Sequence, residues 1–127
     1  MQRTYQIGHS KLSLEFGDIT TSRADVIVSS DDSNLSMGGG VSASIRRAAG
    51  QGILIEAAKR VPAKLGDVIV TGAGLLPAKF VFHAITIGDG NAAPSEVIMN
   101  ATRRCLTILR QLRLSSIAFP AASKPML

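Results

Sequence analysis

The chain has no tryptophan, one tyrosine and one cysteine among its 127 residues. A lone Cys105 cannot form an internal disulfide, which favours a protein of a reducing compartment. No apolar run approaches the length that crosses a membrane, and residues 1–6 lead into no apolar signal core. We therefore expect a cytoplasmic protein without membrane association. Its length suits a single domain, 1–127, with one core.

The scarcity of aromatic residues also weakens the nucleic-acid interpretation that the charge suggests. The formal net charge is +5 and the pI is about 10.0. One tyrosine and no tryptophan offer little surface for stacking on bases. A solvated basic surface is favoured over nucleic acid as a partner, and weak phosphate affinity with steep salt dependence stays an alternative. The basic residues lie on different predicted helices: Arg46, Arg47, Lys59, Arg60, Arg103, Arg104, Arg110 and Arg113.

A glycine-rich stretch, residues 26–50, is the most informative part of the chain. It opens with a short apolar run typical of a buried strand, continues through polar residues, and reaches Gly38, Gly39 and Gly40. Apolar residues then recur at helical spacing until Gly50. A strand, a glycine loop and a helix start together aim bare backbone N–H groups at one point, which suits a phosphate. The alternative is a flexible turn that binds nothing.

Two common phosphate-binding motifs are absent from this stretch. No Lys-Ser or Lys-Thr pair follows the glycines, so the loop is not that of a nucleotide hydrolase. The run from Gly38 to Ala43 also does not match the dinucleotide motif G-x-G-x-x-G. We expect phosphate to be held by another arrangement, with no cofactor and no metal.

Several single residues have two possible roles. Residues 11–16 alternate polar and apolar, which predicts a strand with one buried face, paired as a hairpin with residues 5–7. Asp18 either caps the following turn or accepts a hydrogen bond from a ligand amino group. His83, inside an apolar run, is interpreted as a hydrogen-bonded core residue. Ser95 is predicted to cap the last helix, on which Cys105 packs.

Strands alternate with helices along the whole chain. This order predicts an α/β fold of three layers, with a mixed, mainly parallel sheet covered by helices on both faces. Ligands in such sheets bind at the carboxyl ends of the strands. We therefore expect the site among the four segments that follow predicted strands: residues 17–18, 29–33, 72–74 and 120 onward.

With these elements placed, a set of short segments in one order resembles the macro domain family, whose members bind ADP-ribose. The resemblance runs from about residue 12 to 121 and rests on residues 17–20, 24–28, Leu35, 38–41, 45–50, 66–68, 76–84 and 117–121. It implies that Asp18 accepts from the adenine amino group beside the backbone of Ile19. It also implies that Gly38, Gly39, Gly40 and Val41 wrap the diphosphate, and that Ser30, Asp31 and Asp32 face the distal ribose.

The chain departs from the pattern of the catalytically active members of that family. Those members carry Asn-Ala-Ala-Asn before the glycines and Val-Asp-Gly after them, where this chain has residues 29–32 and 41–43. The Asn that binds ribose is thereby replaced by Asp32 and the catalytic Asp by Ser42. A serine cannot activate water as a carboxylate does. We therefore expect binding of ADP-ribose or ADP-ribosylated protein, with an ADP-ribosyl or O-acetyl-ADP-ribose hydrolase as the alternative.

The hydrolase alternative has one candidate catalytic residue, Asp32. It depends on whether the adjacent carboxylates of Asp31 and Asp32 position a water molecule or are solvated turn residues. The family fold also continues past the Phe-Pro-Ala segment with a loop, a strand and helices, where this chain gives residues 122–127. We expect a fold that lacks this last strand and these helices, exposed apolar surface and weaker binding. Truncation, a disrupted reading frame and completion by a second chain remain alternatives.

Overall fold

The computed structural model describes residues 2–88 and 91–120. The elements are β1 (Gln2–Ile7), β2 (Ser10–Glu15), η1 (Ile19–Thr21), β3 (Val26–Asp32), α1 (Gly40–Ala49), α2 (Gly52–Ala58), β4 (Val68–Gly72), β5 (Phe80–Gly88), β6 (Asn91–Ala92), α3 (Ser95–Gln111) and β7 (Ile117–Ala118). The segment from residue 120 onward was one of the four expected to form the site, and its part after Pro120 lies outside the described residues. None of the described helices is both long enough and apolar enough to cross a membrane.

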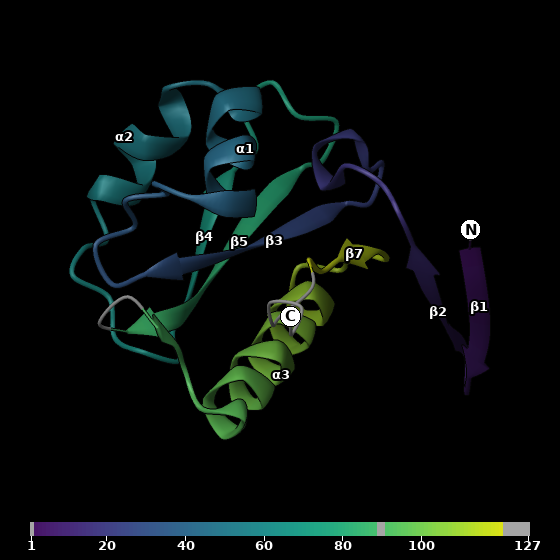
Figure 1. The fold of residues 1–127 in the computed structure, drawn as a ribbon. Coiled ribbons are helices and arrows are strands. Elements are labelled where there is room, and N and C mark those ends of the chain that lie inside the picture. The colour runs from purple at the N-terminus through teal and green to yellow at the C-terminus, as the bar shows by residue number, and fades with distance from the viewer. Residues whose placement is uncertain (1, 89–90, 121–127) are drawn as a thin grey trace.

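A five-stranded sheet forms the centre of the molecule. Its strand order is β4–β5–β3–β7, and β6 pairs with β5. β3 runs parallel to both β5 and β7, whereas β4 and β6 are antiparallel to β5. Figure 1 shows α1 and α2 over one face of the sheet and α3 over the other. The three-layer α/β architecture with a mixed sheet is therefore confirmed.

Each face of the sheet buries its own apolar cluster. Successive side chains of a strand point to opposite faces, so Ile27 of β3 packs towards α1 with Ile45, whereas Val28 packs towards α3 with Cys105. Because β3 is covered on both faces, its first residues are apolar without alternation. The predicted packing of Cys105 on α3 is confirmed.

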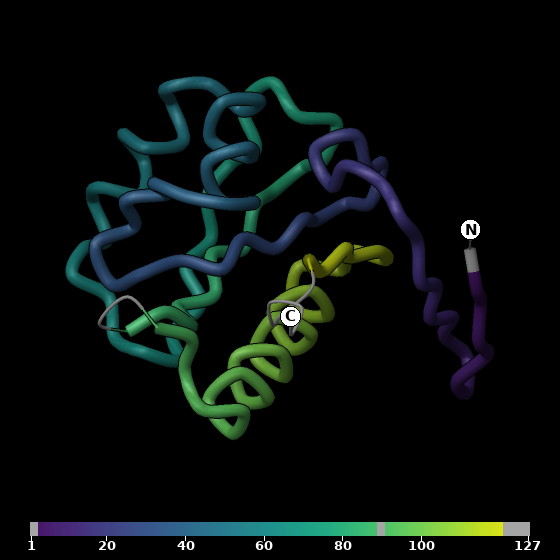
Figure 2. Tube along the Cα trace, viewed as in Figure 1, coloured from purple at the N-terminus to yellow at the C-terminus, as the bar shows by residue number. Residues whose placement is uncertain are grey.

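The first two strands form a hairpin that lies apart from the central sheet (Figure 2). The predicted pairing is confirmed, with Tyr5 opposite Leu12. The predicted buried face is wrong, because Tyr5, Ile7, Leu12 and Leu14 are 44–59% exposed. The pattern of residues 11–16 is amphipathic as predicted, but no described layer covers its apolar face. The exposed apolar surface expected from the sequence was that of the sheet without its last covering elements, and it stays a prediction.

Several predicted boundaries and positions differ from the structure. β3 continues to Asp32, so the polar residues after Val28 belong to the strand. α3 begins at Ser95 itself, and Pro94 is the N-cap, which has no side-chain bond to the helix. Residues 72–74 do not join the predicted site, because the antiparallel β4 ends with Gly72 opposite Phe80, the first residue of β5.

Asp25 ties together the starts of three strands at the opposite end of the sheet from the glycine loop. Its carboxylate accepts hydrogen bonds from the amide and hydroxyl of Ser115, which precedes β7, at 2.8 and 3.1 Å. Its carbonyl accepts from the amides of Lys79 and Phe80, at the start of β5. The Ser115 amide is the main reason that the pKa of Asp25 is lowered. This residue fixes β3, β5 and β7 side by side.

The contrast between hairpin and sheet gives a stability prediction. Phe82→Ala, at a fully buried position, should lower the free energy of unfolding by about 3–5 kcal/mol because it leaves a cavity. Leu14→Ser, on the exposed hairpin face, should change it by no more than about 0.5 kcal/mol. Urea denaturation of both variants measures the difference. Similar losses in the two would mean that the hairpin face is buried in solution.

Candidate functional site

The segment between β3 and α1 is braced by the carboxylate of Asp32. Its Oδ1 accepts from the amides of Asn34 and Ser36 at 2.9 and 3.2 Å, and its Oδ2 accepts from the hydroxyl of Ser36. Its carbonyl accepts from the amide of Leu35 at 2.9 Å. The Ser36 hydroxyl, followed by these amides, holds the pKa of Asp32 below its usual value. Asp32 therefore fixes the loop, and its predicted ribose contact stays a prediction.

Two buried side chains anchor the same loop on unusual backbone. Leu35 and Met37 have φ angles of 52° and 51°, in the left-handed region that L-residues rarely occupy. Both are buried, and Met37 packs in the apolar cluster beneath α1. Such a conformation persists only where the surrounding structure holds it, and it is concentrated at functional sites. The loop is thus rigidly placed before its glycines begin.

The backbone N–H groups of residues 38–42 point to a ligand. Within the described residues none of them donates a hydrogen bond, and the first amide of this segment that does is that of Ala43, to the carbonyl of Gly39. Gly39 is the N-cap of α1 and has no side chain to satisfy the helix start. The three glycines and Val41 are exposed. Uncommitted amides at a helix start form an anion site.

The three glycines differ in what they require of the backbone. Gly40 has a φ of 57°, so a side chain there would be strained. Gly39 has a φ of −152°, which any residue adopts, and a Cβ built on it meets no atom within 4 Å. A side chain at Gly39 would therefore fit the protein without a clash.

Asp18 caps the short turn η1, as one of its two predicted roles required. Its Oδ1 accepts from the amide and hydroxyl of Thr20 at 2.9 and 2.7 Å, and the hydroxyl is the main reason that its pKa is lowered. Its Oδ2 takes no part in these bonds, and the side chain is exposed. Ile19 packs against the cluster beneath α1. The contacts of Asp18 and Ile19 with adenine stay predictions.

A chain of buried polar side chains lies directly beneath the first turn of α1. The Oδ1 of Asp31 lies 2.8 Å from the hydroxyl of Ser42, and its Oδ2 lies 2.7 Å from Nδ1 of His83. Nε2 of His83 lies 2.8 Å from the hydroxyl of Thr71 on β4. Asp31 is 1% exposed, so it is not the solvated turn residue considered from sequence. The core, hydrogen-bonded interpretation of His83 is confirmed.

The connectivity Thr71–His83–Asp31 is that of a nucleophile, a base and an orienting carboxylate. Burial excludes that chemistry, because all three residues are at most 1% exposed and no substrate atom can approach the hydroxyl. Both ring nitrogens of His83 are engaged, so the ring does not reach Ser42. Within the described residues no three His, Cys, Asp or Glu side chains are arranged to hold a metal ion.

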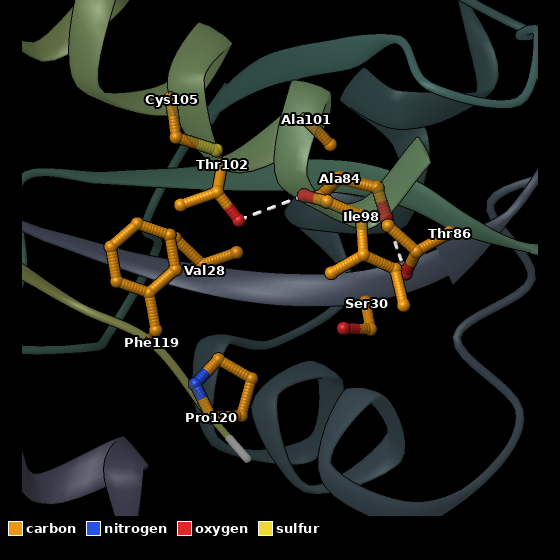
Figure 3. A pocket seen from close by; sticks show the side chains of 10 residues that line it. All are labelled: Val28, Ser30, Ala84, Thr86, Ile98, Ala101, Thr102, Cys105, Phe119 and Pro120. Carbon is orange, nitrogen blue, oxygen red and sulfur yellow. Dashed lines mark hydrogen bonds between the residues drawn. The ribbon is translucent and has the colours of Figure 1, made fainter. Parts of the chain in front are cut away.

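A small pocket opens on the other face of the sheet, beneath α3 (Figure 3). Ser30 is the predicted ligand residue that it contains. Burial raises the pKa of the Cys105 thiol to about 11, so this thiol stays protonated near neutral pH. The pocket is lined by Val28, Ser30, Ala84, Thr86, Ile98, Ala101, Thr102, Cys105, Phe119 and Pro120.

Sequence reasoning missed the roles of Ser42, Thr71 and Ser36 in this site. A signal was available in β3, where Ser29 and Asp31 alternate with residues that face α3 and must therefore point towards α1. Buried polar groups require partners, so the pattern implied polar side chains on the covering helix or the neighbouring strand. It could not identify them, because the partners depend on how β3, β4 and β5 align.

Comparison with known proteins shows which family the chain is similar to. A family model described as Macro domain matches residues 28–124. A macro domain-containing protein of Methanosarcina mazei is 36% identical over 111 residues, which cover 84% of this chain and 58% of that protein. An O-acetyl-ADP-ribose deacetylase of Enterobacter cloacae is 40% identical over 114 residues, covering 84% and 63%. The chain spans about two thirds of the length of its curated relatives.

A solved structure is similar to nearly the whole fold. The Oceanobacillus iheyensis macrodomain with ADP superposes with a TM-score of 0.88 and 30% sequence identity. The superposition covers 97% of this chain and 70% of that chain.

The bracing by Asp32 predicts a dependence of stability on pH. Because its pKa is lowered from 3.8 by folding, the carboxylate stabilises the protein above that value and loses its contribution as the pH falls through the lowered pKa. Asp32→Asn should therefore be less stable than the wild type at about pH 7, with a smaller difference at about pH 3. Urea midpoints at the two pH values measure this.

The matched control is Asn34→Ala, which alters a neighbouring side chain that takes no part in these bonds. Its stability difference from the wild type should not change with pH. The bracing role of Asp32 is refuted if the Asp32→Asn difference is as large in acid as at neutral pH.

Proposed function

The chain belongs to the macro domain family, and on this premise we propose that it binds ADP-ribose, free or attached to protein, through the amides of residues 38–42. The observation that carries the proposal is that none of these amides donates a hydrogen bond within the described residues and that residues 38–41 are exposed. A diphosphate offers several anionic acceptors on adjacent groups. The positive end of α1 adds a favourable field at the same point.

The other predicted site residues would contact the two ends of the ligand, the adenine and the distal ribose. The free Oδ2 of Asp18 can accept from the adenine amino group, and Ile19 would lie beside the ring. Ser30, Asp31 and Asp32 end β3 below the loop, and Asp32 is the one of these whose carboxylate lies in the loop itself. A carboxylate accepts hydrogen bonds from ribose hydroxyls and donates none. The predicted ribose contact therefore uses acceptor positions that the loop amides leave open.

A hydrolase is the alternative, and it is suggested by relatives named O-acetyl-ADP-ribose deacetylase. The geometry of the carboxylates favours binding alone. Asp31 is buried against His83, and both oxygens of Asp32 hold the loop. Ser42 points its hydroxyl into the protein. The carboxylate of Asp31 is thus withdrawn from solvent, and that of Asp32 is engaged in bracing the loop.

The partner that best fits is an ADP-ribosylated protein, and the expected cytoplasmic location and single domain are part of the proposal. The second chain that the sequence suggested stays a further predicted partner. Light scattering on the same sample as the ligand titration would detect it as a doubled mass. Nucleic acid is not favoured, since the loop amides serve a compact anion and not an extended backbone.

Gly39→Val tests the proposed binding mode. The extended backbone and open space at Gly39 allow the new side chain to fold in place, where it blocks the approach to the amides. We expect no binding of ADP-ribose by calorimetry at concentrations that saturate the wild type, with an unchanged melting temperature. Gly39→Ala should weaken binding without abolishing it.

The matched control is Gly52→Val, at another exposed glycine whose Cβ would also meet no atom, here at the start of α2. It should bind as the wild type does. The proposal is wrong if the wild type gives no heat and no thermal shift at millimolar ADP-ribose, or if Gly39→Val binds normally.

Incubation with O-acetyl-ADP-ribose separates binding from hydrolysis. We expect the wild type to bind the compound and release no acetate above the uncatalysed rate, because the carboxylate of Asp31 is buried and that of Asp32 is engaged in bracing the loop. Turnover that is lost in Asp32→Ala and kept in Ser42→Ala would instead make Asp32 the catalytic residue and establish the enzyme.

A further inference from the structure

The hydroxyl of Ser42 joins the first turn of α1 to the end of β3. It lies 2.6 Å from the carbonyl of Ser30, 2.8 Å from Oδ1 of Asp31 and 2.9 Å from the hydroxyl of Ser29. A serine inside a helix commonly bonds to its own preceding turn, as Ser44 does at 3.5 Å. Ser42 instead directs its hydroxyl out of the helix and into the sheet.

The donors and acceptors around Ser42 can be assigned from their number. A hydroxyl has one hydrogen to donate, and the carbonyl of Ser30 and an ionised Asp31 can only accept. Ser42 therefore donates towards these two oxygens, and Ser29 donates to Ser42. Contacts from three directions fix the position of a side chain that belongs to the third residue of α1.

The carboxylate of Asp31 is itself held from the neighbouring strands. Nδ1 of His83 on β5 binds its second oxygen, and Thr71 on β4 binds the far side of the same ring. All three groups are buried, so neither water nor rotation offers an alternative. A continuous path of hydrogen bonds thus leads from β4 through β5 and β3 to the start of α1.

We propose that the buried Asp31–His83 pair positions the anion-binding amides by holding Ser42. This inference rests on the proposed function, because the amides of residues 40–42 belong to the same helical turn as the Ser42 side chain. If that turn shifts, all three N–H groups move relative to a bound diphosphate. Misplacement by about 1 Å is enough to weaken a geometrically demanding interaction strongly.

The alternative role for the Asp31–His83 pair is to stabilise the fold in general. Comparing the binding of ADP-ribose with that of adenosine distinguishes this role from positioning. Loss of positioning weakens ADP-ribose, which contacts the amides, and spares adenosine, which has no phosphate. General destabilisation lowers the melting temperature and affects both ligands alike.

Ser42→Ala and Ser42→Thr form the first pair of variants. Ser42→Ala removes the hydroxyl and should weaken the binding of ADP-ribose about tenfold, the lower end of the effect of one lost hydrogen bond to a charged group. Ser42→Thr keeps the hydroxyl and should restore most of the affinity. Adenosine binding, followed by competition, should be equal in both variants and the wild type.

Asp31→Leu and Asp31→Asn form the second pair. The carboxamide of Asp31→Asn offers an oxygen to Ser42 and an amide N–H to Nδ1 of His83, whose Nε2–H can then donate to Thr71, so Ser42 and both ring nitrogens of His83 keep their partners. We expect Asp31→Asn to retain ADP-ribose affinity and Asp31→Leu to lose it at temperatures where both are folded. In the double variant Asp31→Leu/Ser42→Ala the losses should not add, because one path carries them.

Amide NMR shifts provide a readout without ligand. In Ser42→Ala the ¹H–¹⁵N peaks of residues 40–42 should move, and in Ser42→Thr they should return towards the wild type. Unmoved peaks in Ser42→Ala would overturn the positioning role whether or not ADP-ribose binds. Wild-type affinity in a folded Asp31→Leu would overturn it too, whereas failure of the wild type to bind would reject the proposed function alone.

Discussion

The site depends on how the backbone N–H groups between β3 and α1 find their acceptors. The carbonyl and carboxylate of Asp32 accept from three of these N–H groups, those of residues 34, 35 and 36. The amides of residues 38–42 follow, and none of them donates a hydrogen bond within the described residues. Water or an anion must satisfy them. The loop is rigid up to the point where its donors are free.

The backbone strain of the loop is offset by buried side chains that lie below it. Leu35 and Met37 occupy left-handed backbone, and their burial offsets the strain. Beneath α1 the sheet interior changes from apolar to polar as β3 proceeds from Ile27 to Ser29 and Asp31. A buried carboxylate is tolerated because His83 and Ser42 satisfy both of its oxygens.

Much of the fold followed from local patterns in the chain. The apolar runs at the starts of β3 and β5 and the helical spacing before Gly50 predicted these elements closely. The glycine loop was recognised because glycines between a strand and a helix typically leave backbone N–H groups open to an anion. Predictions failed where a neighbour decides the outcome. The antiparallel direction of β4 moved residues 72–74 away from the site, and the hairpin found no described layer to cover it.

The sequence alone therefore determined the α/β class, the order of its elements and the place of the glycine loop, because these depend on residues adjacent in the chain. Only the tertiary structure decided which polar side chains meet. Asp31 and His83 are far apart in sequence, and they touch because β3 and β5 align with Ser29 opposite His83. A shift of that register by one residue would turn the ring to the other face of the sheet and leave the carboxylate unpaired.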